Sequence, residues 1–168
     1  MNKEIYVYTF YRFKTLKRIK KIKNELDKFT YDKIIYGTVL IAKEGINGSI
    51  SGEKNDVDMF ITKIKKILNI RKLNIKTSKN KFIPFYRLKI KLKNEIVTIG
   101  KKFIKPEKLS GKHVLPKDWD KIIDDKNYLI VDTRNTYEIK IGTFKNAINP
   151  KTNSFREFPK FIKNQKIE

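Results

Sequence analysis

The sequence predicts an α+β protein in two parts, and three observations support this prediction. Over about the first hundred residues, the spacing of apolar residues indicates strand, helix, strand pair, helix and strand, in that order. From 100 to 111, glycines, a proline and several lysines interrupt the pattern, as in a linker. Beyond it, an apolar run over 128–131 ends in Asp132-Thr133-Arg134, which is typical of a buried parallel strand with polar groups at its carboxyl end. We therefore place a domain boundary between residues 105 and 106.

Periodicity predicts the first elements of the domain over 1–105. Ile5 to Phe10 is short, aromatic and β-branched, which favours a strand. A basic helix should follow, because apolar residues recur at helical spacing from Leu16 to Phe29. A buried strand is expected from Ile34 to Ala42. After it, Lys43 to Gly48 contains the glycine and asparagine of a tight reversal, with a return strand over Ser49–Ser51.

A second helix and a last strand complete this domain. The helix is expected from about Asn55, capped by Asn55 or Asp56, to about Asn69. The strand is expected within Phe85–Ile99, where apolar residues alternate with cations, so that one side is apolar and the other basic. The cations are Arg87, Lys89, Lys91 and Lys93. This order of elements fits a ferredoxin-like or acylphosphatase-like sandwich.

The second part, over 106–168, has fewer signals. A helix is predicted to start at Pro116, with Trp119 on its apolar side, and the strand over 128–131 follows. Another short helix is predicted to be entered at Pro159. His113 is a single histidine without clustered ligands, so no metal site is expected.

Charge and composition limit the possible functions. A formal net charge of +22, from 40 Lys+Arg against 18 Asp+Glu, would attract a polyanion such as RNA. The alternative is compositional drift, since lysine, isoleucine and asparagine are abundant and arginine is scarce, as AT-rich codons would give. With no cysteine, the chain has no disulfide, thiolate metal site or cysteine nucleophile of its own. The amino terminus shows neither a signal peptide nor a membrane span, so we expect a cytoplasmic protein without a membrane partner.

Three segments taken together resemble a known family. They are Gly37 to Gly52 (GTVLIAKEGINGSISG), Arg87 to Gly100 (RLKIKLKNEIVTIG), and Val131 to Asn135 (VDTRN) with Ala147 to Pro150 (AINP). Their order and spacing are similar to those of the bacterial rhodanese-containing tRNA uridine hydroxylases. The resemblance implies an acylphosphatase-like domain followed by the first half of an α/β rhodanese domain.

The family's activity is an oxygen-dependent hydroxylation of the wobble uridine of certain tRNAs to 5-hydroxyuridine. The resemblance thus implies molecular oxygen as co-substrate, no identified cofactor, and the tRNA anticodon arm as partner. The essential residue is a cysteine in a Cys-Thr-Gly-Gly-Ile-Arg-Cys loop, which this chain would reach only beyond Glu168. We expect the native gene to encode more protein after Glu168, and the chain alone to be inactive.

The resemblance places Asp132 and Arg134 beside that catalytic loop. Arg134 would then be a cation near the persulfide or the substrate's phosphate. The alternative, which we favour, is a structural ion pair with Asp132 or Glu138, because arginine suits bidentate carboxylate pairing.

The basic residues of the first domain are the candidate RNA contacts. Arg87, Lys89, Lys91 and Lys93 could follow an RNA backbone, with Tyr86, Tyr8 or Tyr11 stacking on bases. The alternative, given equal weight, is that these alternating lysines are only the solvated side of an exposed strand. Lys43, with Glu44 and Asn47, either contacts the anticodon arm or is only a solvated turn.

Two other functions stay open at this point. The chain could be a cysteine-free RNA-binding module or pseudoenzyme remnant that keeps charge and shape without redox chemistry. An acylphosphatase-type hydrolase is disfavoured, because only Arg12, Arg18 and Asn47 are available and the matching glycine-rich loop is missing.

Overall fold

The computed structural model describes residues 4–100 and 111–165, which form two compact units. Of these residues, unit 1 contains 4–96 and unit 2 contains 97–100 and 111–165. The boundary expected between 105 and 106 lies outside the described residues.

Unit 1 is built on a 5-stranded sheet in the order β4-β1-β3-β2-β5. Neighbouring strands are antiparallel, except β2 and β5, which are parallel. The strands are β1 (Ile5–Phe13), β2 (Ile35–Ala42), β3 (Gly45–Gly52), β4 (Asn74–Asn80) and β5 (Leu88–Leu92). With a helix after β1 and another after β3, this is the ferredoxin-like order of elements, so the predicted fold of this unit is confirmed.

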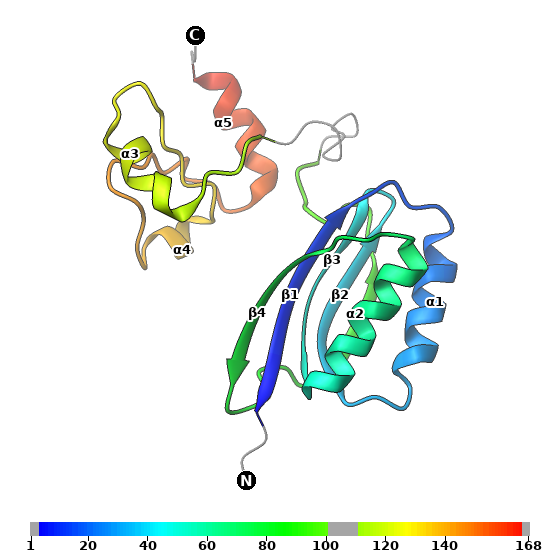
Figure 1. Cartoon of the computed structure of the whole chain (residues 1–168). Coiled ribbons are helices and arrows are strands. Elements are labelled where there is room, and N and C mark those ends of the chain that lie inside the picture. The colour runs from blue at the N-terminus through cyan, green and yellow to red at the C-terminus, as the bar shows by residue number, and fades with distance from the viewer. Residues whose placement is uncertain (1–3, 101–110, 166–168) are drawn as a thin grey trace. The chain divides into compact units, whose positions relative to one another are not determined.

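Two amphipathic helices, α1 (Ile19–Thr30) and α2 (Lys54–Leu68), cover one face of this sheet (Figure 1). Leu16 is buried, as expected, but it precedes α1, because Arg18 adopts a left-handed conformation (φ 54°) where the helix begins. The predicted cap of α2 is wrong: the N-cap is Glu53, and Asn55 and Asp56 lie inside the helix. The end of α2 is as predicted, with Asn69 in the left-handed conformation that terminates helices.

The hairpin between β2 and β3 is tighter than predicted. Ala42 pairs with Gly45, so the turn consists of Lys43 and Glu44, and the expected return strand begins at Gly45 instead of Ser49. Gly45 has a φ of +151°, and a Cβ there would lie 2.1 Å from the carbonyl oxygen of Arg12. The glycine is therefore needed both for this backbone conformation and for the close approach of β1.

Strand β4 was not predicted, and β5 is shorter than the predicted region. Ile75 is the one apolar residue of β4, which lies at the sheet edge and pairs with β1 from Ile5 to Tyr11. Such a strand forms because its backbone completes the ladder, and its side chains give no alternating signal.

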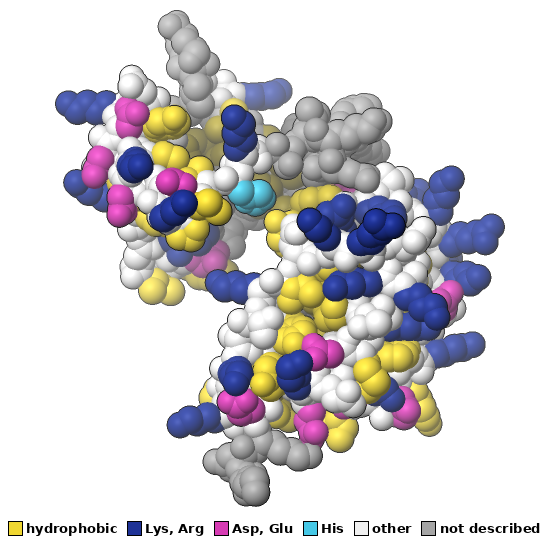
Figure 2. Space-filling model, viewed as in Figure 1, with side chains coloured by type: hydrophobic (Ala, Val, Ile, Leu, Met, Phe, Trp, Pro, Cys, Tyr) yellow, Lys and Arg dark blue, Asp and Glu magenta, His cyan; other side chains and the backbone are white. Residues whose placement is uncertain are grey.

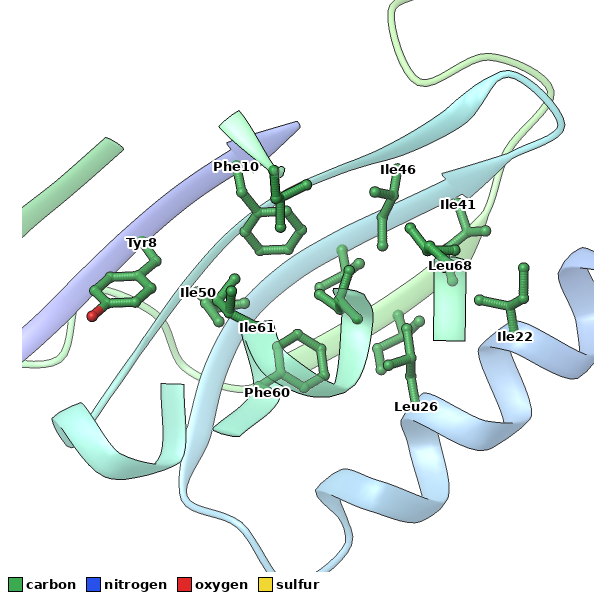
Figure 3. Close-up of a cluster of buried hydrophobic side chains, with 14 of the residues drawn as sticks. Tyr8, Phe10, Ile22, Leu26, Ile41, Ile46, Ile50, Phe60, Ile61 and Leu68 are labelled. Carbon is green, nitrogen blue, oxygen red and sulfur yellow. The ribbon is translucent and has the colours of Figure 1, made fainter. Parts of the chain in front are cut away.

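The core lies between the sheet and the two helices. Phe10, Ile46 and Ile50 point from the strands toward Phe60 of α2 and Leu26 of α1, and all of them are buried (Figure 3). Burying aliphatic and aromatic side chains is worth about 1.5–3 kcal/mol each, so this cluster is the main source of unit 1 stability.

The described residues of unit 2 form short helices and little sheet. As expected, a helical segment starts at Pro116 and another contains Pro159. Its helices are α3 (Trp119–Asp124), α4 (Thr136–Ile139) and α5 (Phe158–Asn164), with 3-10 turns at Pro116–Asp118 and Phe155–Glu157. The strand predicted over 128–131 is reduced to one parallel bridge between Val131 and Ile148, because among the described residues no other segment pairs with it.

Candidate nucleic-acid interface

The cations of β5 lie at one edge of the sheet. Strand β5 pairs with β2 so that Thr38 is opposite Lys89 and Leu40 is opposite Lys91. Ile90, between the two lysines, is buried against the core, so the lysines point to the face that the helices leave uncovered. The alternation predicted from the sequence is therefore confirmed for this strand.

Two further cations extend this row beyond the strand. Arg87 precedes β5 and Lys93 follows it, and both side chains are exposed. Their backbones hold the strand ends in place: the Arg87 carbonyl accepts from Gly37 N at 3.1 Å, and Lys93 N donates to the Ile41 carbonyl at 2.8 Å. We call Arg87, Lys89, Lys91 and Lys93 the β5 cation row. Figure 2 shows Lys and Arg side chains spread over the visible face of unit 1, with fewer carboxylates among them.

Lys43 lies at the same end of the sheet as Lys93. It is exposed in the two-residue turn that follows β2, and β2 runs parallel to β5. Its neighbours in the turn have structural contacts: Glu44 Oε1 accepts from Ile96 N at 2.6 Å, and Asn47 Nδ2 donates to the Ile96 carbonyl at 3.3 Å. Of this group, the Lys43 side chain is the one left pointing to solvent.

The tyrosines proposed for base stacking differ in accessibility. Tyr86 is fully exposed immediately before Arg87, and Tyr11 is 36% exposed on β1. Tyr8 is buried, and its hydroxyl donates to Asp58 Oδ1 at 2.6 Å. Burial and the Asp58 carboxylate raise the pKa of Tyr8 to about 12. The suggestion that Tyr8 stacks on a base is therefore wrong, because its ring belongs to the core.

Asp132 and Arg134 form a hydrogen-bonded network in unit 2. Arg134 Nη2 lies 2.6 Å from Asp132 Oδ2, and the Thr143 hydroxyl donates to the same oxygen at 2.8 Å. The Arg134 hydrogen bonds hold the pKa of the Asp132 carboxyl well below its ordinary value, although burial opposes this shift. Glu138 instead accepts from Asn135 N and caps α4. The structural pairing favoured for Arg134 is present, and its partner is Asp132.

The residues considered for acylphosphatase-type hydrolysis do not gather at one site. Arg12 pairs with Ile46 and shares its core-facing side, whereas Asn47 pairs with Tyr11 on the opposite face. Arg18 begins α1. In the part of the chain that the structure describes, His, Cys, Asp and Glu form no group of three that could hold a metal ion. None of the helices described is long and apolar enough to cross a membrane.

Comparison with known proteins identifies the first unit. The family model of the UPF0176 acylphosphatase like domain matches residues 5–96, which is more than half of the chain. The chain belongs to this family. The predicted family and the acylphosphatase-like fold are thereby confirmed, and the matched residues coincide with unit 1.

A curated relative extends the similarity into unit 2. The tRNA uridine(34) hydroxylase of Pelagibacter ubique (strain HTCC1062) is 45% identical over 157 residues, which cover 93% of this chain and 52% of the relative. The chain thus spans about half the length of that relative. Among solved structures, an acylphosphatase from Coxiella burnetii is 10% identical over 53% of this chain and 94% of its own, with a TM-score of 0.39. The acylphosphatase from Bacillus subtilis is 12% identical over 51% of this chain and 97% of its own, with a TM-score of 0.38.

Proposed function

We propose that this UPF0176 chain acts in tRNA modification, as part of a cytoplasmic tRNA uridine hydroxylase that forms 5-hydroxyuridine at the wobble position with molecular oxygen. The observation that supports this most strongly is the 45% identity to a tRNA uridine(34) hydroxylase over 93% of the chain. Similarity at this level covers both units, so both belong to the proposed enzyme.

The two units have different roles in this proposal. Unit 1 binds the anticodon arm through the β5 cation row and Lys43, whose side chains are exposed at one edge of the sheet. Residues 106–168, which include most of unit 2, are the first half of a rhodanese domain. In it, the Asp132–Arg134 pair holds the loop that follows Val131 in shape beside the catalytic loop. With no cysteine in these 168 residues, the reactive thiol must come from residues outside them.

A second candidate function follows from the same absence. A chain with no cysteine and a net charge of +22 would also serve as a non-catalytic RNA-binding module. Deletion of the gene would remove 5-hydroxyuridine from tRNA if the chain belongs to the hydroxylase, and would leave this nucleoside in place if the chain only binds RNA.

Nucleoside mass spectrometry of tRNA from gene-deleted cells tests the proposal. We expect 5-hydroxyuridine to disappear on deletion and to return with the native locus, but not with a copy encoding only these 168 residues. An unchanged level of 5-hydroxyuridine after deletion would refute the hydroxylase function. If the purified chain then binds tRNA, the RNA-binding module would be the better account. Full restoration by the 168-residue copy would refute the need for an outside thiol.

A further inference from the structure

We call the face of the sheet opposite α1 and α2 the open face of unit 1. Polar side chains lie in its middle, and Val7 and Tyr36 point to the same side. Because directly paired residues of adjacent strands point to the same side, the register assigns its side chains in rows that cross the sheet. One row contains Lys76, Thr9, Ser49, Thr38 and Lys89, from β4 to β5. Hydroxyl groups therefore fill the middle of this row, and a lysine stands at each edge.

The hydroxyls in the middle of the row are held in place. Thr9 Oγ1 and Ser49 Oγ lie 2.8 Å apart, so they share one hydrogen bond and keep lone pairs for a ligand. Thr9, Lys76 and Lys89 are exposed, while Ser49 and Thr38 are half-buried between their neighbours.

The neighbouring row adds an aromatic ring. It contains Asn74, Tyr11, Asn47, Leu40 and Lys91. Asn47 donates to the Ile96 carbonyl, so residue 96 covers the middle of this row, and Tyr11 and Lys91 on either side of it are exposed. Tyr11 is 36% exposed, and its ring packs edge-on against Phe13, with 6.2 Å between the ring centroids. Phe13 limits the movement of the tyrosine while leaving part of its ring accessible.

The two rows contain no charge that would repel a polyanion. Neither row contains an aspartate or glutamate. Helix α1, another basic surface of unit 1, includes Glu25 and Asp27, and Asp27 pairs with Lys23. Charge complementarity to RNA therefore favours the open face over α1.

We propose that the open face binds a single-stranded segment of RNA, with a base stacked on Tyr11 and phosphates held by Lys89 and Lys91 at one edge and Lys76 at the other. A single strand exposes its bases to stacking, whereas a duplex presents mainly its backbone. Five strands about 4.8 Å apart give a surface about 19 Å wide, comparable to sheets that stack two or three bases. This inference rests on the proposed function in taking tRNA as the natural RNA.

The test measures binding of the purified chain to a labelled 12-nucleotide single-stranded RNA, to a duplex of the same length, and to tRNA. Base stacking on an aromatic ring is worth about 1–3 kcal/mol, so Tyr11→Ala should weaken single-strand binding about tenfold. Tyr11→Phe should bind within about twofold of the unmodified chain, because a phenyl ring still stacks. Tyr31→Ala should have no effect, because Tyr31 is 95% exposed just after α1 and away from the open face.

A second pair of variants keeps the test valid if Tyr11→Ala does not fold. Thr9→Asp places a carboxylate in the middle of the open face, and Thr62→Asp places one on exposed α2 surface. We expect about tenfold weaker single-strand binding for the first variant and little change for the second. Equal affinities of these two variants, or duplex binding that equals single-strand binding, would overturn the inference.

The outcomes separate this inference from the proposed function. Unchanged tRNA binding by Tyr11→Ala and Thr9→Asp would overturn the inference and leave tRNA as the partner. Single-strand binding that depends on Tyr11, without binding to tRNA, would support the inference and count against the proposed function.

Discussion

The guanidinium of Arg134 forms a two-point ion pair with the carboxylate of Asp132, two residues earlier in the chain. Nε lies 3.0 Å from Oδ1, and Nη2 lies 2.6 Å from Oδ2. The same Nη2 donates to the Gly142 carbonyl at 2.6 Å. One arginine therefore fixes both ends of the segment between Asp132 and Gly142, which contains α4. This contact holds the segment in place where the described residues form only one β-bridge.

Replacing Arg134 by lysine should destabilise unit 2, because an ammonium group cannot reproduce the fork geometry. We expect the free energy of unfolding to fall, but by less than for a fully buried pair, because the arginine side chain is 46% exposed. Trp119, which stacks on Phe144 in the same unit, reports urea unfolding by fluorescence. Lys145→Ala removes only an exposed pair to Asp124 and serves as the control. Equal effects of the two substitutions would show that the fork is unimportant.

The pKa of Asp132 predicts how unit 2 responds to acid. Hydrogen bonds from Arg134 lower this pKa from its ordinary 3.8, so the charged carboxylate stabilises the folded state. That stabilisation is fully present above the unfolded-state pKa and is lost as the pH falls below about 4 toward the folded-state value. We expect the urea midpoint of unit 2 to fall between about pH 5 and 3, and to fall less in Asp132→Asn. The same acid sensitivity in that variant would mean that other groups cause it.

Tyr8 should ionise only at a pH well above the ordinary range of a phenol. Its pKa of about 12 means that unit 1 loses stability as the pH rises from about 10 through 12, because the folded state retains the phenol proton. Tyr8→Phe should cost about 1 kcal/mol at neutral pH, through loss of the hydrogen bond to Asp58, and should flatten the alkaline decline. Ultraviolet titration and urea unfolding measure both effects, with the exposed Tyr31→Phe as control. Identical alkaline curves for the two variants would contradict the assignment.

Limited proteolysis should separate the two units. Unit 1 has a continuous core under its sheet, whereas the described part of unit 2 has one β-bridge and exposes Tyr128, Leu129 and Ile141. Segments with few buried apolar contacts open locally at low free energy. We expect a fragment near residues 5–96 to survive after unit 2 is digested, as mass spectrometry would show. Equal resistance of both units would contradict this difference in stability.

Apolar periodicity predicted the elements whose own side chains are buried. Helices α1 and α2 and strands β1 and β2 were predicted because burial of one face places apolar residues at a regular spacing, as from Val57 to Leu68 in α2. Strand β4 was missed because its pairing with β1, and not its mostly polar side chains, makes it a strand. The residues of such a strand do not themselves show which other strand they will pair with.

The candidate site was predicted in part for a similar reason. Alternation along β5 was enough to predict that Lys89 and Lys91 are exposed. Strand β1 has large side chains on both faces, so the sequence could not show that Tyr8 is buried and Tyr11 is exposed. The open face combines five strands far apart in the sequence. Its rows follow from the register, which only the structure provides.

The most direct test of RNA binding by unit 1 is the affinity for tRNA as a function of salt. It compares the unmodified chain with Lys89→Glu/Lys91→Glu on the open face and with Lys20→Glu/Lys21→Glu on α1, which makes the same change in net charge. We predict that the β5 variant binds at least about tenfold more weakly, with a slope of log affinity against log salt shallower by about 1–2, because two phosphate contacts are lost. The α1 variant should be affected far less. Equal losses in both variants, with an unchanged slope for the β5 variant, would contradict the account and leave the lysines as ordinary solvated surface.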